Sequence, residues 1–438
     1  MSRFDIGVWM FAGTLVVIAL RMPVAGAMLL VGGAGYAAIN GWMPLLSTLK
    51  TMTYSKFASN TLAVLPLFLL MGEFATQGGM NSRLFRAARA WFGHWRGGLA
   101  MATIGGCAAF GAICGSSLAT AATMCKVALP EMRAAGYSPS LATGTLAAGG
   151  TLGILIPPSI ILVIYAIYTE QSVGALFVAA VIPGLIATIQ YMIVVGLYAR
   201  LVPGACPSIA PAPWKERLVA TRGAWPIAAV FGLIVAGIYR GWFSASEGAA
   251  VGALMMLVFA VFKGGMRMAG FVESVRNAGQ TSAMIFLIMF SAELFSAALA
   301  SSQMPAELAR QVAAVNASPY MIVVVIMLAY MVLGCFMESL AMVLLTLPVF
   351  IPLVLSLDLG LGKDATLVWF GILVLMSVEI GMISPPFGLN LFLINSMSGG
   401  VPMKETYKGV LGFCTMDVLR VLLIVFVPVL ALWLPGLK

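Results

Sequence analysis

The sequence predicts an all-α polytopic membrane protein built from two inverted repeats. Of its 438 residues, 61% are hydrophobic and only 9% are charged, whereas soluble domains carry about 25% charged residues. No soluble core could bury so much apolar surface, so the chain is expected to lie in a lipid bilayer. Two proline pairs, Pro157-Pro158 and Pro385-Pro386, interrupt long apolar segments at matching places in the two halves.

A spanning helix needs about 20 mostly apolar residues. Segments of this kind predict about ten spanning helices, two of them broken near the bilayer midplane, and two re-entrant helical hairpins. The apolar segments are 4–20, 23–40, 61–79, 98–129 (hairpin), 140–168, 174–200, 224–239, 243–262, 280–300, 319–356 (hairpin), 365–397 and 409–433.

The proline pairs predict helices that break inside the membrane. Proline removes a backbone donor and clashes with the preceding turn, and the residue before it is pushed out of the α region. Lipid offers no partners for the freed backbone groups, so such breaks occur where protein, water, ions or substrate supply them. The alternative is a kink that neighbouring helices satisfy.

Six motifs recur in the same order in both halves, which argues for duplication. Their spacing stays between 218 and 228 residues. The matched pairs are Arg21 and Arg240, Phe68 and Phe286, Ser117 and Ser339, Pro130 and Pro352, Pro157 and Pro385, and Gly184 and Gly412.

Basic residues set the predicted topology. Lysine and arginine concentrate within 83–96, 200–222 and 263–276, and basic loops favour the cytoplasmic side. With all three clusters there, hairpin 98–129 must open to the cytoplasm and hairpin 319–356 to the outside. The halves are then oppositely oriented, with both chain termini predicted periplasmic. An inverted repeat with broken helices is the architecture of a secondary transporter.

The predicted organisation alternates scaffold and transport units. The divisions are 1–60 (scaffold helices and an interfacial arm), 61–200 (first transport unit), 201–222 (cytoplasmic linker), 223–279 (second scaffold and arm) and 280–438 (second transport unit).

Small polar residues at each hairpin tip are expected to meet the broken helix of the same half. Helix C-termini present carbonyls to a sodium ion, and helix N-termini present N–H groups to an anion. The alternative for the serines is ordinary interhelical hydrogen bonding. The candidate ion-binding residues are Gly115, Ser116, Ser117, Gly153, Gly334, Glu338, Ser339, Gly381 and Ser384. The candidate substrate-binding residues are Ser117, Thr151, Pro157, Pro158, Ser159, Pro385, Pro386 and Asn390.

Acids within apolar segments are costly and point to function. Glu338 is the best ion-site candidate because it lies at a predicted tip, whereas Glu379 is placed to brace the second break. Arg420 is expected to pair with an acid or to extend towards the membrane surface. For the remaining acids a structural role is favoured; they are Glu73, Glu293 and Asp417.

Five motifs together resemble the large membrane subunit, of the M or DctM type, of tripartite ATP-independent periplasmic transporters. The resemblance covers almost the whole chain. The motifs are Gly115-Ser-Ser-Leu-Ala-Thr-Ala-Ala, Gly153-Ile-Leu-Ile-Pro-Pro-Ser, Pro183-Gly-Leu, Glu247-Gly-Ala-Ala-Val-Gly-Ala and Glu379-Ile-Gly-Met-Ile-Ser-Pro-Pro-Phe-Gly-Leu-Asn.

The resemblance implies an elevator mechanism within the ion-transporter superfamily fold, in the bacterial inner membrane. Sodium would drive uptake of a small organic acid, with no other cofactor. The implied partners are a small four-helix membrane subunit (Q or DctQ type), expected to be separate because no extra N-terminal helices are present, and a periplasmic substrate-binding protein (P or DctP type). The implied ion sites map onto Ser116, Ser117, Gly153, Glu338, Ser339 and Gly381.

Other function classes are less well supported. A stand-alone Na⁺/anion symporter or exporter of the same superfamily remains the alternative. An enzyme is not expected, because one histidine excludes an H-E-x-x-H pair and no Walker A loop is present. Nucleic-acid binding is not expected either, since the basic residues lie in short loops between apolar segments.

Overall fold

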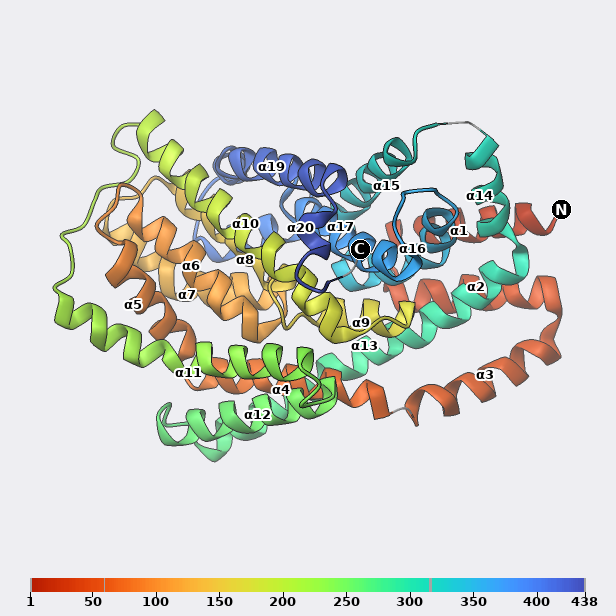
Figure 1. Cartoon of the computed structure of the whole chain (residues 1–438), viewed down its shortest axis with the longest axis horizontal. Coiled ribbons are helices and arrows are strands. Elements are labelled where there is room, and N and C mark those ends of the chain that lie inside the picture. Colours follow the sequence, from red (N-terminus) through yellow and green to blue (C-terminus); the bar gives the residue numbers. More distant parts are fainter. Residues whose placement is uncertain (1, 59, 315–316, 437–438) are drawn as a thin grey trace.

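The computed structural model describes residues 2–58, 60–314 and 317–436, and every regular element among them is a helix (Figure 1). The first half contains α1 (Arg3–Ala19), α2 (Val24–Asn40), α3 (Trp42–Phe57), the 3₁₀ helix η1 (Asn60–Ala63), α4 (Val64–Gln77), α5 (Met80–Phe92), α6 (Gly98–Cys114), α7 (Ser117–Ala134), α8 (Pro139–Leu155), α9 (Ile160–Thr169) and α10 (Val173–Leu201).

The second half repeats this order. It contains α11 (Trp214–Tyr239), α12 (Ala245–Phe262), α13 (Met268–Ser302), α14 (Met304–Ala314), α15 (Pro319–Gly334), α16 (Ser339–Leu355), α17 (Lys363–Ile383), α18 (Leu389–Met397), α19 (Met403–Phe426) and the short α20 (Val429–Leu432). Seven described segments are long and apolar enough to cross a membrane, and the shorter α1, α2 and α4 complete the expected ten. The protein is an all-α polytopic membrane protein.

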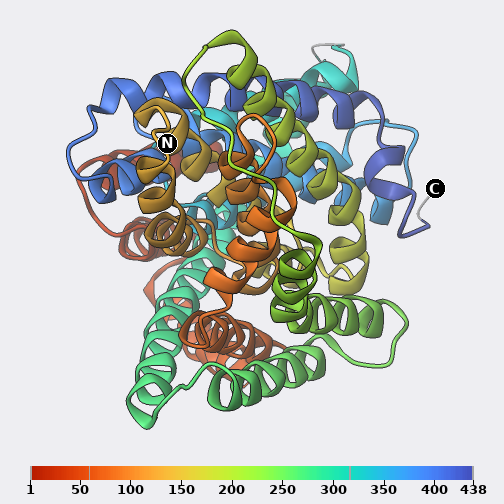
Figure 2. The ribbon, with the colours of Figure 1, turned by 90° about the vertical axis from the view of Figure 1, so that its left-hand side faces the viewer.

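The two halves exchange packing partners. Helix α2 packs against α13 and α12 packs against α4, while α1 contacts α14 and α11 contacts α5. Likewise α18 packs on α7 and α8, and α9 contacts α16 and α17. Every one of these pairs has a counterpart with the halves interchanged, which is how an inverted repeat packs. Figures 1 and 2 show α12 along one edge, with α5, α6 and α7 above it.

Both expected hairpins and both expected breaks are present. Helices α6 and α7 meet at Gly115, whose φ of +62° favours glycine, and α15 and α16 are joined through residues 335–338. Helix α8 ends at Leu155 before α9 begins, and α17 ends at Ile383 before α18 begins. The Pro157-Pro158 and Pro385-Pro386 peptide bonds are both cis.

The second arm differs from the prediction. The expected boundary between 223–279 and 280–438 falls inside α13, which runs unbroken for 35 residues. The boundary carries Gly279, which a helix tolerates at a cost of about 1 kcal/mol, and α13 contains no proline. In the first half η1 separates α3 from α4, and Pro66 in the first turn of α4 suits a helix start because it needs no N–H there.

The linker is shorter than the predicted 201–222, because α11 begins at Trp214. Pro213 precedes it with extended backbone, and Glu216 in the first turn interacts favourably with the helix dipole.

Two amphipathic helices, α5 and α14, were not predicted. Helix α5 buries Met80, Leu84 and Phe85 on one face while its arginines lie on the other. A search for long apolar runs misses a helix of this kind.

The three basic clusters lie on one side of the molecule. The guanidinium of Arg83 donates to the carbonyl of Lys263 at 2.7 Å, and Arg83, Arg86 and Arg89 line a pocket together with the linker residues 209–213. This agrees with the assumption behind the predicted topology. The chain ends, Met1 and 437–438, lie outside the described residues.

Candidate functional site

Each hairpin crosses its broken helix at a pair of glycines. A Cβ on Gly111 of α6 would lie 2.6 Å from the Cα of Gly153 on α8. A Cβ on Gly381 of α17 would lie 2.5 Å from the Cα of Gly334 on α15. Only glycine permits backbones to approach this closely, so these residues set the distance between each tip and each break.

Oxygen atoms of two first-tip residues surround the first crossing. A Cβ on Gly153 would lie 2.6 Å from the Thr120 hydroxyl and 2.9 Å from the carbonyl of Ser116. The Thr120 hydroxyl is buried and has no hydrogen-bond partner. The end of α8 also leaves its last carbonyls without intrahelical partners. These oxygens are of the kind that a sodium ion collects.

The second tip is built differently. Glu338 caps α16, because its Oε2 accepts hydrogen bonds from the N–H groups of Leu340 and Ala341, both at 3.1 Å. Ser116 caps α7 in the equivalent place, accepting from Ala119 at 3.5 Å. The Ser339 hydroxyl lies 2.9 Å from the sulfur of Met382. A carboxylate therefore stands at one tip where the other has a hydroxyl.

Both tips line one cavity of about 160 Å³, which we call the tip cavity. Its walls come from the two tips, from both broken helices and from the helices α4 and α13. Its polar and tip residues are Gly115, Ser116, Ser117, Thr281, Glu338 and Ser339. Typical pockets for larger ligands enclose about 300–1,000 Å³, so this space suits ions and small groups.

A hydrogen bond joins the second break to the first tip. The Asn390 amide of α18 donates to the Ser117 hydroxyl at 2.7 Å and to the carbonyl of Ala147 at 3.1 Å. Its own Oδ1 is buried without a partner. Gly150 makes room for this contact, since a Cβ there would lie 3.2 Å from the Asn390 nitrogen.

The remaining candidate residues predicted from the sequence differ in their exposure to solvent. Pro157, Pro158 and Ser159 are buried, and Ser384 is half-buried. Pro385 and Pro386 are exposed. None of these six residues lines the tip cavity.

Thr151 points elsewhere, into a chain of polar groups that we call the ion cluster. Arg420 of α19 pairs with Glu379 of α17 at 2.8 Å and with Asp417 at 3.0 Å, and all three side chains are fully buried. The Tyr191 hydroxyl donates to Asp417 at 2.7 Å and lies 3.2 Å from the Thr151 hydroxyl.

Arg420 pairs with acids, as expected. Glu379 lies in the last turns of α17, before the second break. Sequence reasoning missed Tyr191. The spacing between the repeats contained a signal, because Thr151 and Glu379 are 228 residues apart, like Pro157 and Pro385. The ion cluster thus joins equivalent positions of the two broken helices.

The family follows from comparison of the whole chain. Residues 11–430 match the model of the tripartite ATP-independent periplasmic transporter, DctM component. The chain belongs to this DctM family. Among its relatives, the C4-dicarboxylate TRAP transporter large permease protein DctM of Pseudomonas aeruginosa is 36% identical over 378 residues, covering 86% of each chain. The ectoine TRAP transporter large permease protein TeaC of Halomonas elongata is 31% identical over 421 residues, covering 95% of each.

The fold of this DctM-family chain is shared more widely. The crystal structure of the Alcanivorax borkumensis YdaH transporter superposes with a TM-score of 0.63 at 15% identity, covering 90% of each chain. The sequence relatives are named as transporter permeases and not as enzymes. The chain is therefore a large permease subunit of a tripartite membrane transporter, a family whose name implies further membrane and periplasmic components.

Proposed function

We propose that this subunit couples sodium entry to the uptake of a small organic acid across the bacterial inner membrane. The tip cavity carries the proposal, because it brings hydroxyls and a carboxylate from both repeats into one space. Ser116, Ser117 and Gly153 would hold sodium at the first tip, with Glu338, Ser339 and Gly381 at the second. An anion would lie between them, facing helix N-termini that favour negative charge.

Transport would proceed by an elevator movement. The tip cavity is closed on one side by Leu69 of α4 and by Thr281 and Met284 of α13, which belong to the helices exchanged between the halves. The part of the protein that contains the hairpin tips and the broken helices would slide along α4 and α13, which we call the frame. The apolar character of Leu69 and Met284 suits a sliding contact, because such residues hold no fixed polar partner.

The substrate would be delivered by a periplasmic binding protein, and a small four-helix membrane subunit would pair with the frame. The relatives' names include a C4-dicarboxylate and ectoine, which supports a carboxylate as the recognised group. Basic residues of all three clusters gather on one side, which supports a cytoplasmic position for that side and hence periplasmic termini; they are Arg83, Arg86, Arg89, Arg222 and Lys263.

Sodium-driven uptake into proteoliposomes containing the complete transporter tests the proposal. Ser117→Ala and Ser339→Ala each remove a hydroxyl from the tip cavity, and we expect the sodium-dependent rate to fall about tenfold, as for the loss of one ligand to a charged species. Ser396→Ala is the matched control, since that exposed hydroxyl bonds only within α18. Unchanged sodium dependence in both tip variants, with folding intact, would remove the ion-site assignment.

A further inference from the structure

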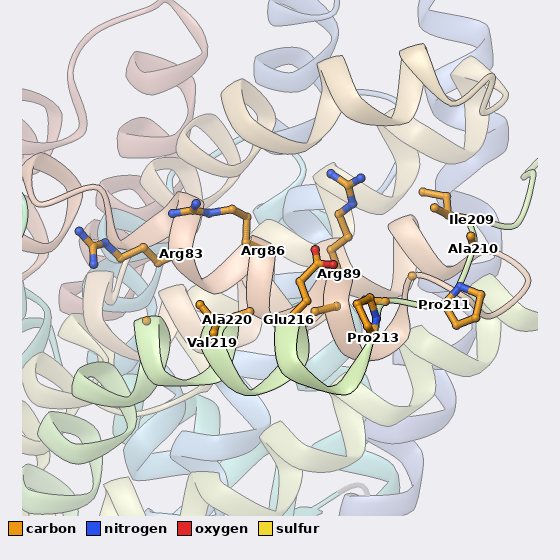
Figure 3. A pocket seen from close by; sticks show the side chains of 14 residues that line it. Arg83, Arg86, Arg89, Ile209, Ala210, Pro211, Pro213, Glu216, Val219 and Ala220 are labelled. Carbon is orange, nitrogen blue, oxygen red and sulfur yellow. The ribbon is translucent and has the colours of Figure 1, made fainter.

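A basic pocket of about 650 Å³ lies between α5, the linker and α11, far in sequence from the tips (Figure 3). Arg83, Arg86 and Arg89 follow one another along α5, and Glu216 stands on α11 (Figure 3). With three guanidinium groups and one carboxylate, the pocket carries net positive charge.

The arginines differ in how they are satisfied. Arg89 pairs with Glu131 at 2.7 Å, and Arg83 donates to the Lys263 carbonyl at 2.7 Å. Arg86 is exposed and forms no ion pair within the described part of the chain; its one hydrogen bond, at 3.4 Å, goes to the carbonyl of Ser82 in its own helix. Arg86 therefore has its charge available for an incoming anion.

An apolar groove of about 550 Å³ adjoins this pocket and shares Arg83 and Gly223 with it. The groove runs between α11 and α12. Its other lining residues include Arg222, Trp225, Ala229, Val258 and Phe262. A free phosphate ion would use the basic pocket and leave the groove empty, whereas a phospholipid fills both.

We propose that one phospholipid with an anionic headgroup binds here, with its phosphate at Arg86 and Arg222 and an acyl chain along the groove. Basic pockets on the cytoplasmic side of membrane proteins bind such headgroups. Two tryptophans also join α5 to α11. The Arg217 guanidinium lies 5.7 Å from the ring centre of Trp91 on α5 and 5.1 Å from that of Trp214 on α11. Tryptophan rings prefer this level of the membrane.

Helix α14 occupies the place of α5 in the second repeat, and its described residues lack the row of arginines. Its one arginine, Arg310, pairs with Glu307 at 2.7 Å. One lipid per chain is therefore expected.

Native mass spectrometry of the full-length chain in detergent tests the proposal by titration with phosphatidylglycerol and phosphatidylcholine. We expect one phosphatidylglycerol bound in preference, and Arg86→Gln and Arg222→Gln each to weaken it roughly fivefold. Arg276→Gln is the matched control, because it removes an exposed charge of the third basic cluster that lines neither cavity. Equal affinity for both lipids, or no effect of Arg86→Gln, would overturn the site.

Further experiments distinguish a bound lipid from a bound free anion and from a bound protein partner. Ala229→Trp narrows the groove and should weaken phosphatidylglycerol binding while melting behaviour stays unchanged; retained affinity contradicts the acyl-chain position. Displacement of the lipid by millimolar inorganic phosphate would show an anion site only. Its displacement by the co-expressed small membrane subunit would show that protein covers the groove, and either result overturns the proposal. Because binding is measured without transport, its failure would leave the proposed uptake untouched.

Discussion

The two broken helices have matching sequences but different surroundings. Ser159 and Phe387 occupy equivalent places, because they are 228 residues apart, as Pro157 and Pro385 are. Ser159 is fully buried, whereas the Phe387 side chain is 49% exposed and its ring lies tilted against that of Phe336, with ring centres 5.1 Å apart. The backbone therefore follows the repeat symmetry, whereas the exposure of the side chains at the two breaks does not.

This difference is what alternating access requires. A symmetric pair of breaks would open both sides of the membrane at once or neither, and no gradient could be coupled. Under the proposed elevator movement, the exposed second break and the buried first break would represent one of two states, and a movement of the tip-bearing body would exchange their roles. The following variants test or sharpen that contrast.

The largest contrast is expected in chemical labelling. In a background lacking the six native cysteines, Phe387→Cys should react with a membrane-impermeant maleimide, because thiols react as thiolates in contact with water. Ser159→Cys should react at least about tenfold more slowly, since it requires an opening of the structure. Rates are compared by mass shift after a short pulse. Similar rates would mean that the two breaks are equally accessible, contrary to the structure.

The ion cluster joins the two broken helices unequally, because Glu379 supplies a charge from α17 where the equivalent Thr151 supplies only a hydroxyl from α8. Arg420→Met leaves Glu379 and Asp417 buried without their cation, and we expect it to lower the free energy of unfolding by about 3–5 kcal/mol. Unfolding in detergent by SDS titration measures the change. The triple variant Glu379→Met, Asp417→Met, Arg420→Met should recover most of it. If the single and triple variants are equally unstable, packing rather than charge holds this region.

The glycine crossings differ in what an added methyl group meets. Gly381→Ala places its Cβ against the backbone of Gly334, which cannot rotate away, and we expect a loss of about 1–3 kcal/mol. Gly153→Ala meets the Thr120 hydroxyl at 2.6 Å and one backbone atom, the Ser116 carbonyl oxygen, at 2.9 Å. It should cost less, because the backbone atoms that Gly381→Ala meets are closer, at 2.5 and 2.7 Å. Gly232→Ala, with open space around it, is the control and should not destabilise. A greater cost at Gly153 would reverse the ranking of the two crossings.

The smallest effect concerns the bond between the second break and the first tip. A double-mutant cycle of Ser117→Ala with Asn390→Leu should give a coupling energy of about 1 kcal/mol, the value of one buried hydrogen bond. The equivalent cycle of Ser339→Ala with Leu162→Ala should stay within about 0.5 kcal/mol, because Leu162 has no polar atom. Equal coupling in both cycles would show that the contact is not specific to Asn390.

Much of the architecture could be predicted from the sequence because lipid imposes simple rules. Spanning length, proline breaks and basic loops determined the order of elements, the hairpins and the repeat. The boundary expected between 279 and 280 falls inside α13, because Gly279 alone does not break a helix that continues through it. Helix α5 was missed because its arginines conceal the apolar face that buries Leu84 and Phe85.

The site was harder to predict, because it depends on side-chain directions. The sequence placed Ser117, Glu338 and Ser339 at the hairpin tips, and in the structure all three line the tip cavity. It could not show that Thr151 turns towards Tyr191, because every residue around it on α8 is buried and no face is distinguished by polarity.

The exchange of partners between the halves has a consequence for how the chain is made. Helix α2 emerges early from the ribosome, yet the surface it rests on belongs to α13 and is synthesised much later. Neither half encloses a complete interior, so an isolated half would expose its small-residue surfaces to lipid. A single unit of this kind could cover those surfaces only by pairing with a second copy inserted the other way round.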